Sequence, residues 1–175
     1  MRRIGPEKMI GLPKGELFLS DYDARWNQAF EEESIELNRR IGDVIAGIHH
    51  IGSTAVLNLR AKPIIDIAIE LIDFEEGYGC RELLSAMGYK HRIVPELAER
   101  HYFSKGDPRT HQIHMFKPHS PFLKEQIEFR NQLRERPELA LAYQKLKERL
   151  VFTHSRDKLA YAVAKTDFIR SVLDE

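Results

Sequence analysis

The amino-acid sequence predicts an α/β fold: a small mixed, largely antiparallel sheet of about five strands, helices on one face, and a bundle of three C-terminal helices packed onto it. Two short apolar runs, at residues 44–51 and 64–69, are typical of buried strands. Apolar residues recur at helical spacing over residues 26–41 and again through the last third of the chain. We therefore assign residues 1–118 to an α/β core and residues 119–175 to a helical segment packed on the same domain.

The composition limits the class of protein. A chain of 175 residues with 42% hydrophobic content can bury one sizeable core. Lys plus Arg and Asp plus Glu both number 27, so no bulk charge recruits nucleic acid or an anionic membrane, and any phosphate binding must come from a local cluster. The single cysteine, Cys80, excludes an intrachain disulfide and a Cys-based zinc site. No apolar run approaches about 18 residues and no secretory signal follows Arg2 and Arg3, so we expect a cytoplasmic protein.

A long amphipathic helix is the first regular element that we expect. Residues 1–15 combine Gly, Pro and Lys without a period and predict an irregular lead that becomes a short strand at residues 17–19. Asp23 is a suitable N-cap, and the helical pattern that follows it ends near Gly42 after about five turns. The acidic run at residues 31–33 predicts a solvated face of this helix.

The middle of the chain predicts the remainder of the sheet. Alternation along the strand at residues 44–51 places His49 and His50 on opposite faces. Beyond the second strand, we expect a helix at residues 74–87 and a strand at residues 89–94. Two further strands are expected at residues 101–105 and 110–117, joined by a Gly/Asp/Pro turn.

Everything after this hairpin is expected to be helical. Ser120 before Pro121 predicts an N-cap with proline at the first helical position, and this helix continues to Arg136. Pro137 begins a second helix, and Ser155 is the expected N-cap of a third. The aromatic residues of these helices are interpreted as core.

The most informative stretch joins the two apolar runs. Gly52 and Ser53 form a turn whose backbone N–H groups suit phosphate oxygens, and Lys62 follows in the same connector. Asp66 lies within the second apolar run, where a carboxylate needs a cation or a proton as partner. A carboxylate on this strand suits the Mg²⁺ that accompanies phosphates. Together these residues predict a nucleoside triphosphate site.

The second carboxylate that a two-metal site requires is missing. Polymerase-type transfer uses two carboxylates two residues apart on one strand face, and Ala68 occupies the second position. Glu70 shares the face but lies about 13 Å along the strand from Asp66, against about 6.6 Å for the required spacing. We therefore interpret Glu70 as a solvated strand end.

Histidine and basic residues of the hairpin are further candidates. Alternation places His114 and His111 on opposite faces, so only one of them can easily face Asp66. Lys105 and Arg109 flank the turn and could help Lys62 to balance a triphosphate, although surface charges need no such explanation. A histidine hydrogen-bonded within the sheet is the corresponding structural alternative.

The Gly-Ser turn followed after twelve residues by Asp in a hydrophobic strand resembles the nucleotidyltransferase superfamily, and the longer pattern resembles its GrpB-like branch. The resemblance extends from about residue 17 to residue 173. It is carried by Tyr22-Asp23 with Trp26, Lys62 to Ile67, Arg109 to His111 with His114, Phe129-Arg130 with Pro137 to Ala140, and Lys165 with Phe168-Ile169.

The chain departs from the family pattern at several positions, among them residues 56–59 and Gln112. The segment at residues 56–59 stands where the family commonly has Val-Pro-Gly-Leu, but Asn58 tolerates the positive φ that the glycine would supply. Gln112 stands where the family usually has a third histidine, which weighs against a histidine-rich metal centre. His50 beside the turn matches a histidine of the family.

The resemblance implies a metal-dependent nucleotidyltransferase that moves a nucleoside monophosphate from a triphosphate to an unknown small-molecule or macromolecular acceptor. Gly52 and Ser53 would hold the phosphates, Asp66 would ligate Mg²⁺ or Mn²⁺, and His114 or His111 would ligate the metal or act as general base. The assigned phosphate-binding group also includes Lys62, His50, Lys105 and Arg109.

Two alternatives remain open from the sequence. Ala68 favours a non-catalytic nucleotide- or phosphate-binding accessory module, as the fusion of some family members to dephospho-CoA kinase would suggest. A hydrolytic transition-metal site built on the histidine strand is the other. Association into a homodimer is compatible with either.

Overall fold

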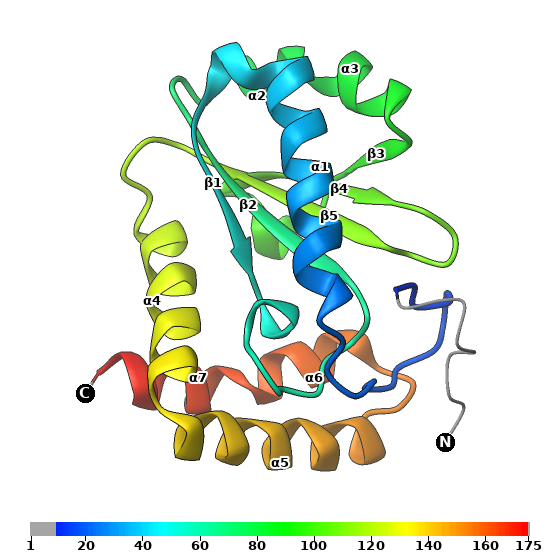
Figure 1. Cartoon of the computed structure of the whole chain (residues 1–175), viewed down its shortest axis with the longest axis vertical. Helices are drawn as coiled ribbons and strands as arrows, with labels where there is room; N and C mark the ends of the chain where they lie inside the picture. Colours follow the sequence, from blue (N-terminus) through cyan, green and yellow to red (C-terminus); the bar gives the residue numbers. More distant parts are fainter. Residues whose placement is uncertain (1–9, 175) are drawn as a thin grey trace.

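The computed structural model describes residues 10–174, and its centre is a five-stranded sheet in the order β1-β2-β5-β4-β3. All neighbouring strands are antiparallel except β2 and β5, which run parallel. The predicted mixed, largely antiparallel sheet is therefore confirmed (Figure 1). The strands are β1 (Ile45–Ile51), β2 (Ile65–Leu71), β3 (Tyr89–Arg92), β4 (Arg100–Lys105) and β5 (His111–Phe116).

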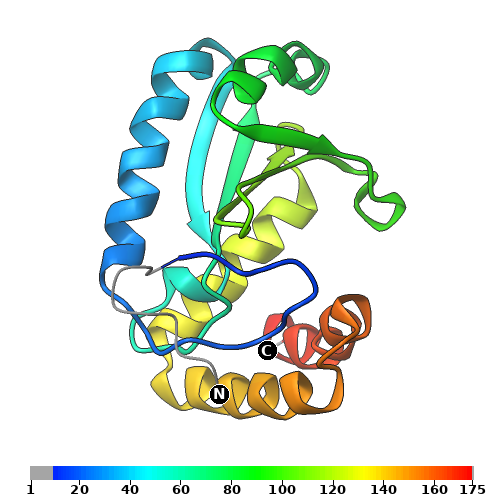
Figure 2. The same ribbon diagram turned by 90° about the vertical axis from the view of Figure 1, so that its right-hand side faces the viewer.

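The helices lie along the sheet and at one of its ends. Figures 1 and 2 show α1 along one face of the sheet, and α5, α6 and α7 gathered beyond the end of the strands. Within the described residues, no helix is long and apolar enough to cross a membrane. The α-helices are α1 (Arg25–Ile41), α2 (Glu76–Gly79), α3 (Arg81–Ala86), α4 (Pro121–Glu135), α5 (Pro137–Thr153), α6 (Lys158–Ala164) and α7 (Thr166–Leu173).

The two faces of β2 have opposite characters. Ile65, Ile67 and Ile69 are fully buried in the main core, which α1 and α3 complete. Each such side chain contributes about 1.5–3 kcal/mol through burial, so this face fixes the register of the strand. Because side chains alternate along a strand, Asp66 and Ala68 lie on the other face, where α4 packs over Ala68.

Two expected elements differ from the structure, and another lies mostly outside the described residues. The segment at residues 17–19 is not a strand: Leu17 and Leu19 are buried, and only Ser20 forms an isolated bridge, with Ala61. The helix expected at residues 74–87 is divided into α2 and α3 at Cys80. Most of the irregular lead, residues 1–9, lies outside the described residues.

The C-terminal segment contains four helices rather than three. Ser155 is not the cap of the third, because the Asp157 side chain accepts the Ala160 N–H at 2.9 Å and α6 begins after it. The chain then turns at Lys165, whose N–H bonds the Ala162 carbonyl three residues back at 3.4 Å. This turn separates α6 from α7 and places Lys165 between them.

The loop between β1 and β2 contains the positive φ that we expected at Asn58, where φ is 61°. We predict that the free energy of unfolding of Asn58→Ala is about 1 kcal/mol lower than that of Asn58→Gly, because a residue with a Cβ is strained in the left-handed region. Urea unfolding of the two variants measures the difference. Equal stabilities would show that this conformation carries no strain.

Candidate functional site

The candidate site begins where the Gly-Ser turn crosses Asp66. Ile51, the last residue of β1, pairs with Asp66 on β2, and Gly52 follows with φ of 72°. A Cβ on Gly52 would lie 2.7 Å from Asp66 Oδ2, so only glycine lets the backbone pass this close to the carboxylate. Ser53 then starts a short 3₁₀ turn that directs the chain toward the C-terminal helices.

A buried lysine connects this turn to α5. The ammonium group of Lys147 donates to Ser53 Oγ at 3.0 Å and to the carbonyl oxygen of Arg60. The side chain is only 2% exposed, and burial, followed by the nearby charges of Lys165 and Lys62, holds its pKa well below the usual value. The Nζ atom of Lys147 therefore holds both ends of the connector between β1 and β2.

Two more lysines approach the same place. Lys62 and Lys165 lie on the Tyr161 ring, with Nζ atoms 5.5 and 4.6 Å from its centroid. Burial, reinforced by Lys62 and opposed by Asp66, lowers the pKa of Lys165 to about 7. Burial and Arg109 lower the pKa of Lys62, again opposed by Asp66. We call Lys62, Lys147 and Lys165 the lysine cluster.

The C-terminal helices also hold the connector through its backbone. Arg130 of α4 donates to the His50 carbonyl at 2.8 Å, and Arg134 donates to the Ala55 carbonyl at 2.9 Å. The Arg60 guanidinium pairs with Glu148 of α5 at 2.8 Å. These arginines hold the loop and the helices together, so they position the site instead of facing a ligand.

His114 is the histidine that the structure places beside Asp66. Its Nε2 atom lies 3.8 Å from Asp66 Oδ1, and its ring stacks on Tyr102 with centroids 5.0 Å apart. Its Nδ1 atom lies 3.5 Å from the Arg100 guanidinium, which can only donate, so the neutral ring carries its proton on Nε2. A protonated Nε2 suits hydrogen bonding to Asp66 better than ligation of a metal.

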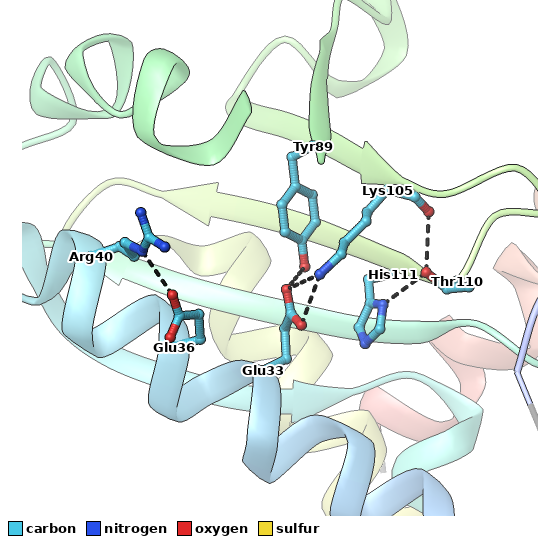
Figure 3. Close-up of polar contacts among 7 residues, drawn as sticks. All are labelled: Glu33, Glu36, Arg40, Tyr89, Lys105, Thr110 and His111. Atoms are coloured by element: carbon cyan, nitrogen blue, oxygen red, sulfur yellow. Dashed lines mark hydrogen bonds and ion pairs between the residues drawn. The ribbon is translucent and has the colours of Figure 1, made fainter. Parts of the chain in front are cut away.

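His111 and Lys105 lie on the opposite face of the sheet (Figure 3). Lys105 Nζ pairs with both carboxylate oxygens of Glu33, at 2.9 and 3.0 Å, and Tyr89 donates to the same carboxylate at 2.8 Å. His111 is buried with Nδ1 2.9 Å from Thr110 Oγ1. Lys105 therefore ties β4 to α1, and both residues lie on the face away from Asp66. Glu33 is a structural partner instead of a solvated charge.

His50 also faces α1 instead of the Asp66 side. It pairs with Ile67 across the strands, stacks on Phe30 at 4.7 Å between centroids, and contacts Thr54 Oγ1 through Nε2 at 2.9 Å. Burial lowers its pKa to about 4, so the ring is neutral at physiological pH and offers no charge to a phosphate. Its neighbour His49 pairs with Ala68, as expected from alternation.

Arg109 lies on the same side of the sheet as Asp66. It lines a cavity of about 560 Å³ together with Lys62 and Gln112, and its guanidinium donates to the Tyr102 hydroxyl at 3.4 Å. Of the nine residues predicted from the sequence, the structure thus groups six on one side of the sheet. These are Gly52, Ser53, Lys62, Asp66, Arg109 and His114.

The donor set does not fit a two-metal centre. Ala68 provides no ligand, and Glu70 accepts the His119 N–H at 2.8 Å, so it is engaged by a loop. Among residues 10–174, no three His, Cys, Asp or Glu side chains are arranged to bind a metal ion. One Mg²⁺ shared between Asp66 and the phosphates of a ligand fits what is present, because Mg²⁺ commonly binds one protein carboxylate with phosphates and water.

Sequence reasoning missed Lys147, Tyr143 and Tyr161. Tyr143 and Tyr161 were interpreted as core, and both are buried, but Tyr143 hydrogen-bonds Ser53 and Tyr161 supports the lysine cluster. Lys147 follows Tyr143 by one helical turn, on the same apolar stripe as Leu146 and Leu150. A lysine at a position of the helix that is otherwise apolar could have indicated that Lys147 is buried and functional.

These features define a mixed α/β protein in which a C-terminal helical segment closes over a Gly-Ser connector. The family model described as "GrpB protein" matches residues 16–175, and the chain belongs to this family. The UPF0157 protein YqkA of Bacillus subtilis is 36% identical over 160 residues, which cover 91% of this chain and 47% of that protein. The chain therefore spans about half the length of that relative.

Two GrpB proteins match over nearly their whole length. The glutamate-rich protein GrpB of Alkalihalophilus pseudofirmus is 30% identical, with 95% of this chain and 99% of that protein covered. The crystal structure of GrpB from Enterococcus faecalis superposes with a TM-score of 0.82 at 31% identity, covering 90% of this chain and 95% of that chain. A more distant likeness, to the MgGTP-bound poly(U) polymerase Cid1, has a TM-score of 0.49 at 13% identity over 77% of this chain and 43% of that chain.

Because Lys147 is buried, its replacement by an apolar residue should change the stability of the protein. We expect Lys147→Met to raise the free energy of unfolding at pH 7 by about 1 kcal/mol, roughly 2–4 °C in Tm, because it removes a buried ammonium group. The lowered pKa means that the folded chain binds fewer protons than the unfolded chain, so the advantage should shrink as pH rises toward 10. Thermal unfolding at several pH values measures this, with Lys145→Met on the exposed side of α5 as control. A less stable Lys147→Met variant would contradict the prediction.

Proposed function

We propose that the site binds the phosphates of a nucleoside triphosphate and that the protein is a nucleotidyltransferase. The observation that carries this proposal is the lysine cluster beside Ser53. Lys62 and Lys165 lower the pKa of Lys147, and Lys62 also lowers the pKa of Lys165. Asp66 opposes the lowering at Lys62 and Lys165. Such an arrangement becomes favourable when a polyanion enters.

Each group of residues at the site would have a separate role in binding the triphosphate. The open backbone at Gly52 and the hydroxyl of Ser53 would contact phosphate oxygens, as glycine-containing turns do in other phosphate sites. The lysine cluster would balance the triphosphate charge, and the Tyr161 ring would hold Lys62 and Lys165 through cation–π contacts. Asp66 would hold one Mg²⁺, which supplies electrostatic stabilisation of the charge that develops on the phosphates.

In the proposed reaction, an acceptor oxygen bonds the α-phosphorus while the bond from the α-phosphorus to the bridging oxygen breaks. Pyrophosphate leaves with that electron pair, and the proton of the acceptor passes to solvent. His114, whose Nε2 lies 3.8 Å from Asp66 Oδ1, would keep the carboxylate oriented during this exchange. The Gly-Ser turn followed by Asp66 in a buried strand, together with membership of the GrpB family, supports this class of reaction.

A second candidate function is binding without transfer. Ala68 and the engaged Glu70 leave one carboxylate at the site, which favours a nucleotide-binding accessory module. Incubation with ATP labelled at the α-phosphate and a mixture of acceptor compounds separates the two. Appearance of the label on an acceptor compound, with release of pyrophosphate, supports transfer, and binding of ATP without labelled product supports the module.

Asp66 provides the test of metal-dependent binding. We predict that wild-type protein binds ATP with Mg²⁺ at least tenfold more tightly than Asp66→Asn does, because the variant keeps the shape of the side chain but loses the charge that holds the ion. Calorimetric titration of ATP, GTP, CTP and UTP with and without Mg²⁺ measures both. Equal affinities of the two proteins would remove Asp66 from the metal site.

Lys165 provides a test of pH dependence. A pKa of about 7 means that this side chain is charged below neutral pH and neutral above it, so triphosphate affinity should fall as pH rises. Lys62 lowers the pKa of Lys165 further and Asp66 raises it, and the net shift remains downward. Between pH 6 and pH 8.5, we expect a loss of about three- to tenfold in wild-type protein beyond that of Lys165→Met. Parallel pH curves would contradict the role of Lys165, and Lys145→Met controls for the loss of one charge.

A further inference from the structure

A row of polar side chains crosses the sheet from Asp66 to its far edge. Asp66 on β2 pairs with Gln112 on β5, Gln112 pairs with Ser104 on β4, and Ser104 pairs with Lys90 on β3. Register partners lie on the same face, and neighbouring strands are about 4.8 Å apart, so the row extends about 14 Å from the carboxylate. We call these four residues the polar row.

A cavity of about 560 Å³ lies along this row. It contains Gln112, Ser104 and Lys90 of the polar row, and also Lys62 of the lysine cluster. Its charged lining has six basic side chains against one carboxylate, that of Asp107. The basic residues are Lys14, Lys62, Lys90, Arg92, Arg109 and Lys158.

The basic side chains come from separate parts of the chain. None of the six takes part in an ion pair within residues 10–174. Burial lowers the pKa of Lys158 on α6, and the charges of Arg109 and Lys62 lower it further, which indicates that these three groups are close together. Arg92 is oriented by a bond from its Nε to Ser104 Oγ at 2.8 Å.

Protection of a sheet edge would be the ordinary explanation for Lys90 and Arg92, since β3 is an edge strand. That explanation covers two residues of one strand. It does not account for Lys62, Arg109 and Lys158, which approach the same cavity from a connector, a turn and a helix. It also does not account for the alternation of β3, which buries Tyr89 and directs Lys90 and Arg92 to the cavity face.

We propose that this cavity is the acceptor site, and that the acceptor is a small phosphorylated molecule. Its phosphate would lie near Lys90, Arg92 and Arg109, and its reactive group would extend along the polar row toward Asp66. The volume is in the range of small-molecule sites, and the balanced charge of the whole chain does not favour a nucleic-acid acceptor. This inference rests on the proposed nucleotidyltransferase function.

The test is an NMR titration of full-length ¹⁵N-labelled protein with inorganic phosphate, after saturation with α,β-methylene-ATP and Mg²⁺. We expect saturable shifts of the Ser104 and Gln112 amides. In Lys90→Glu/Arg92→Glu, the apparent affinity for phosphate should fall at least tenfold, with nucleotide affinity changed less than twofold. Lys145→Glu/Arg149→Glu makes the same change of charge on the exposed side of α5 and should behave as wild type.

Absence of shifts at Ser104 and Gln112, or equal phosphate affinity in the two double variants, would overturn the inference. Preferential binding of a single-stranded oligonucleotide at the same amides would also overturn it. If the protein binds no nucleotide, the proposed function fails separately, and phosphate is titrated into free protein. Shifts at Ser104 and Gln112, distinguished from shifts at Ser53, then still report on the cavity. Arg92→Gln repeats the comparison if the double variant does not fold.

Discussion

The site depends on the hydrogen bonds of one buried ammonium group. Lys147 reaches Ser53 at the start of the connector and the carbonyl of Arg60 near its end, so α5 holds a loop that belongs to the sheet. Arg130 and Arg134 add bonds from α4 to the same loop. The C-terminal helices are thus part of the site itself, and the Gly-Ser turn takes its shape from contacts between both parts of the chain.

The buried lysines lower the stability of the free protein but would favour the binding of an anionic ligand. A buried cation is costly when no anion accompanies it, and neighbouring cations increase that cost. The folded protein retains the lysine cluster, although an apolar residue at position 147 would suit the stripe of α5. Conflict between local stability and side-chain chemistry is typical of functional sites, because binding a ligand of opposite charge relieves it.

The strands and most helices could be predicted because apolar periodicity follows directly from burial. The same periodicity correctly separated His114 from His111, since alternation decides which strand residues share a face. Periodicity could not tell which face of the sheet held the site, because this depends on which face α1 covers. Lys105 was therefore grouped with the site, whereas Glu33 of α1 holds it on the other face. Lys147 lies 94 residues from Ser53 in sequence, so no local pattern could connect the two.

A neutral chain with a strongly basic site requires that opposite charges be separated in space. The totals of 27 basic and 27 acidic residues cancel, yet the cavity beside Asp66 is lined by six basic residues and one acidic residue. A local field of this kind attracts a small polyanion without attracting long ones, because charge beyond about a Debye length is screened. With Ala68 in place of a second carboxylate, the protein itself supplies little negative charge to hold metal ions. The phosphates of the nucleotide would then have to supply the remaining metal contacts, because the phosphate of the acceptor would lie at the other end of the polar row.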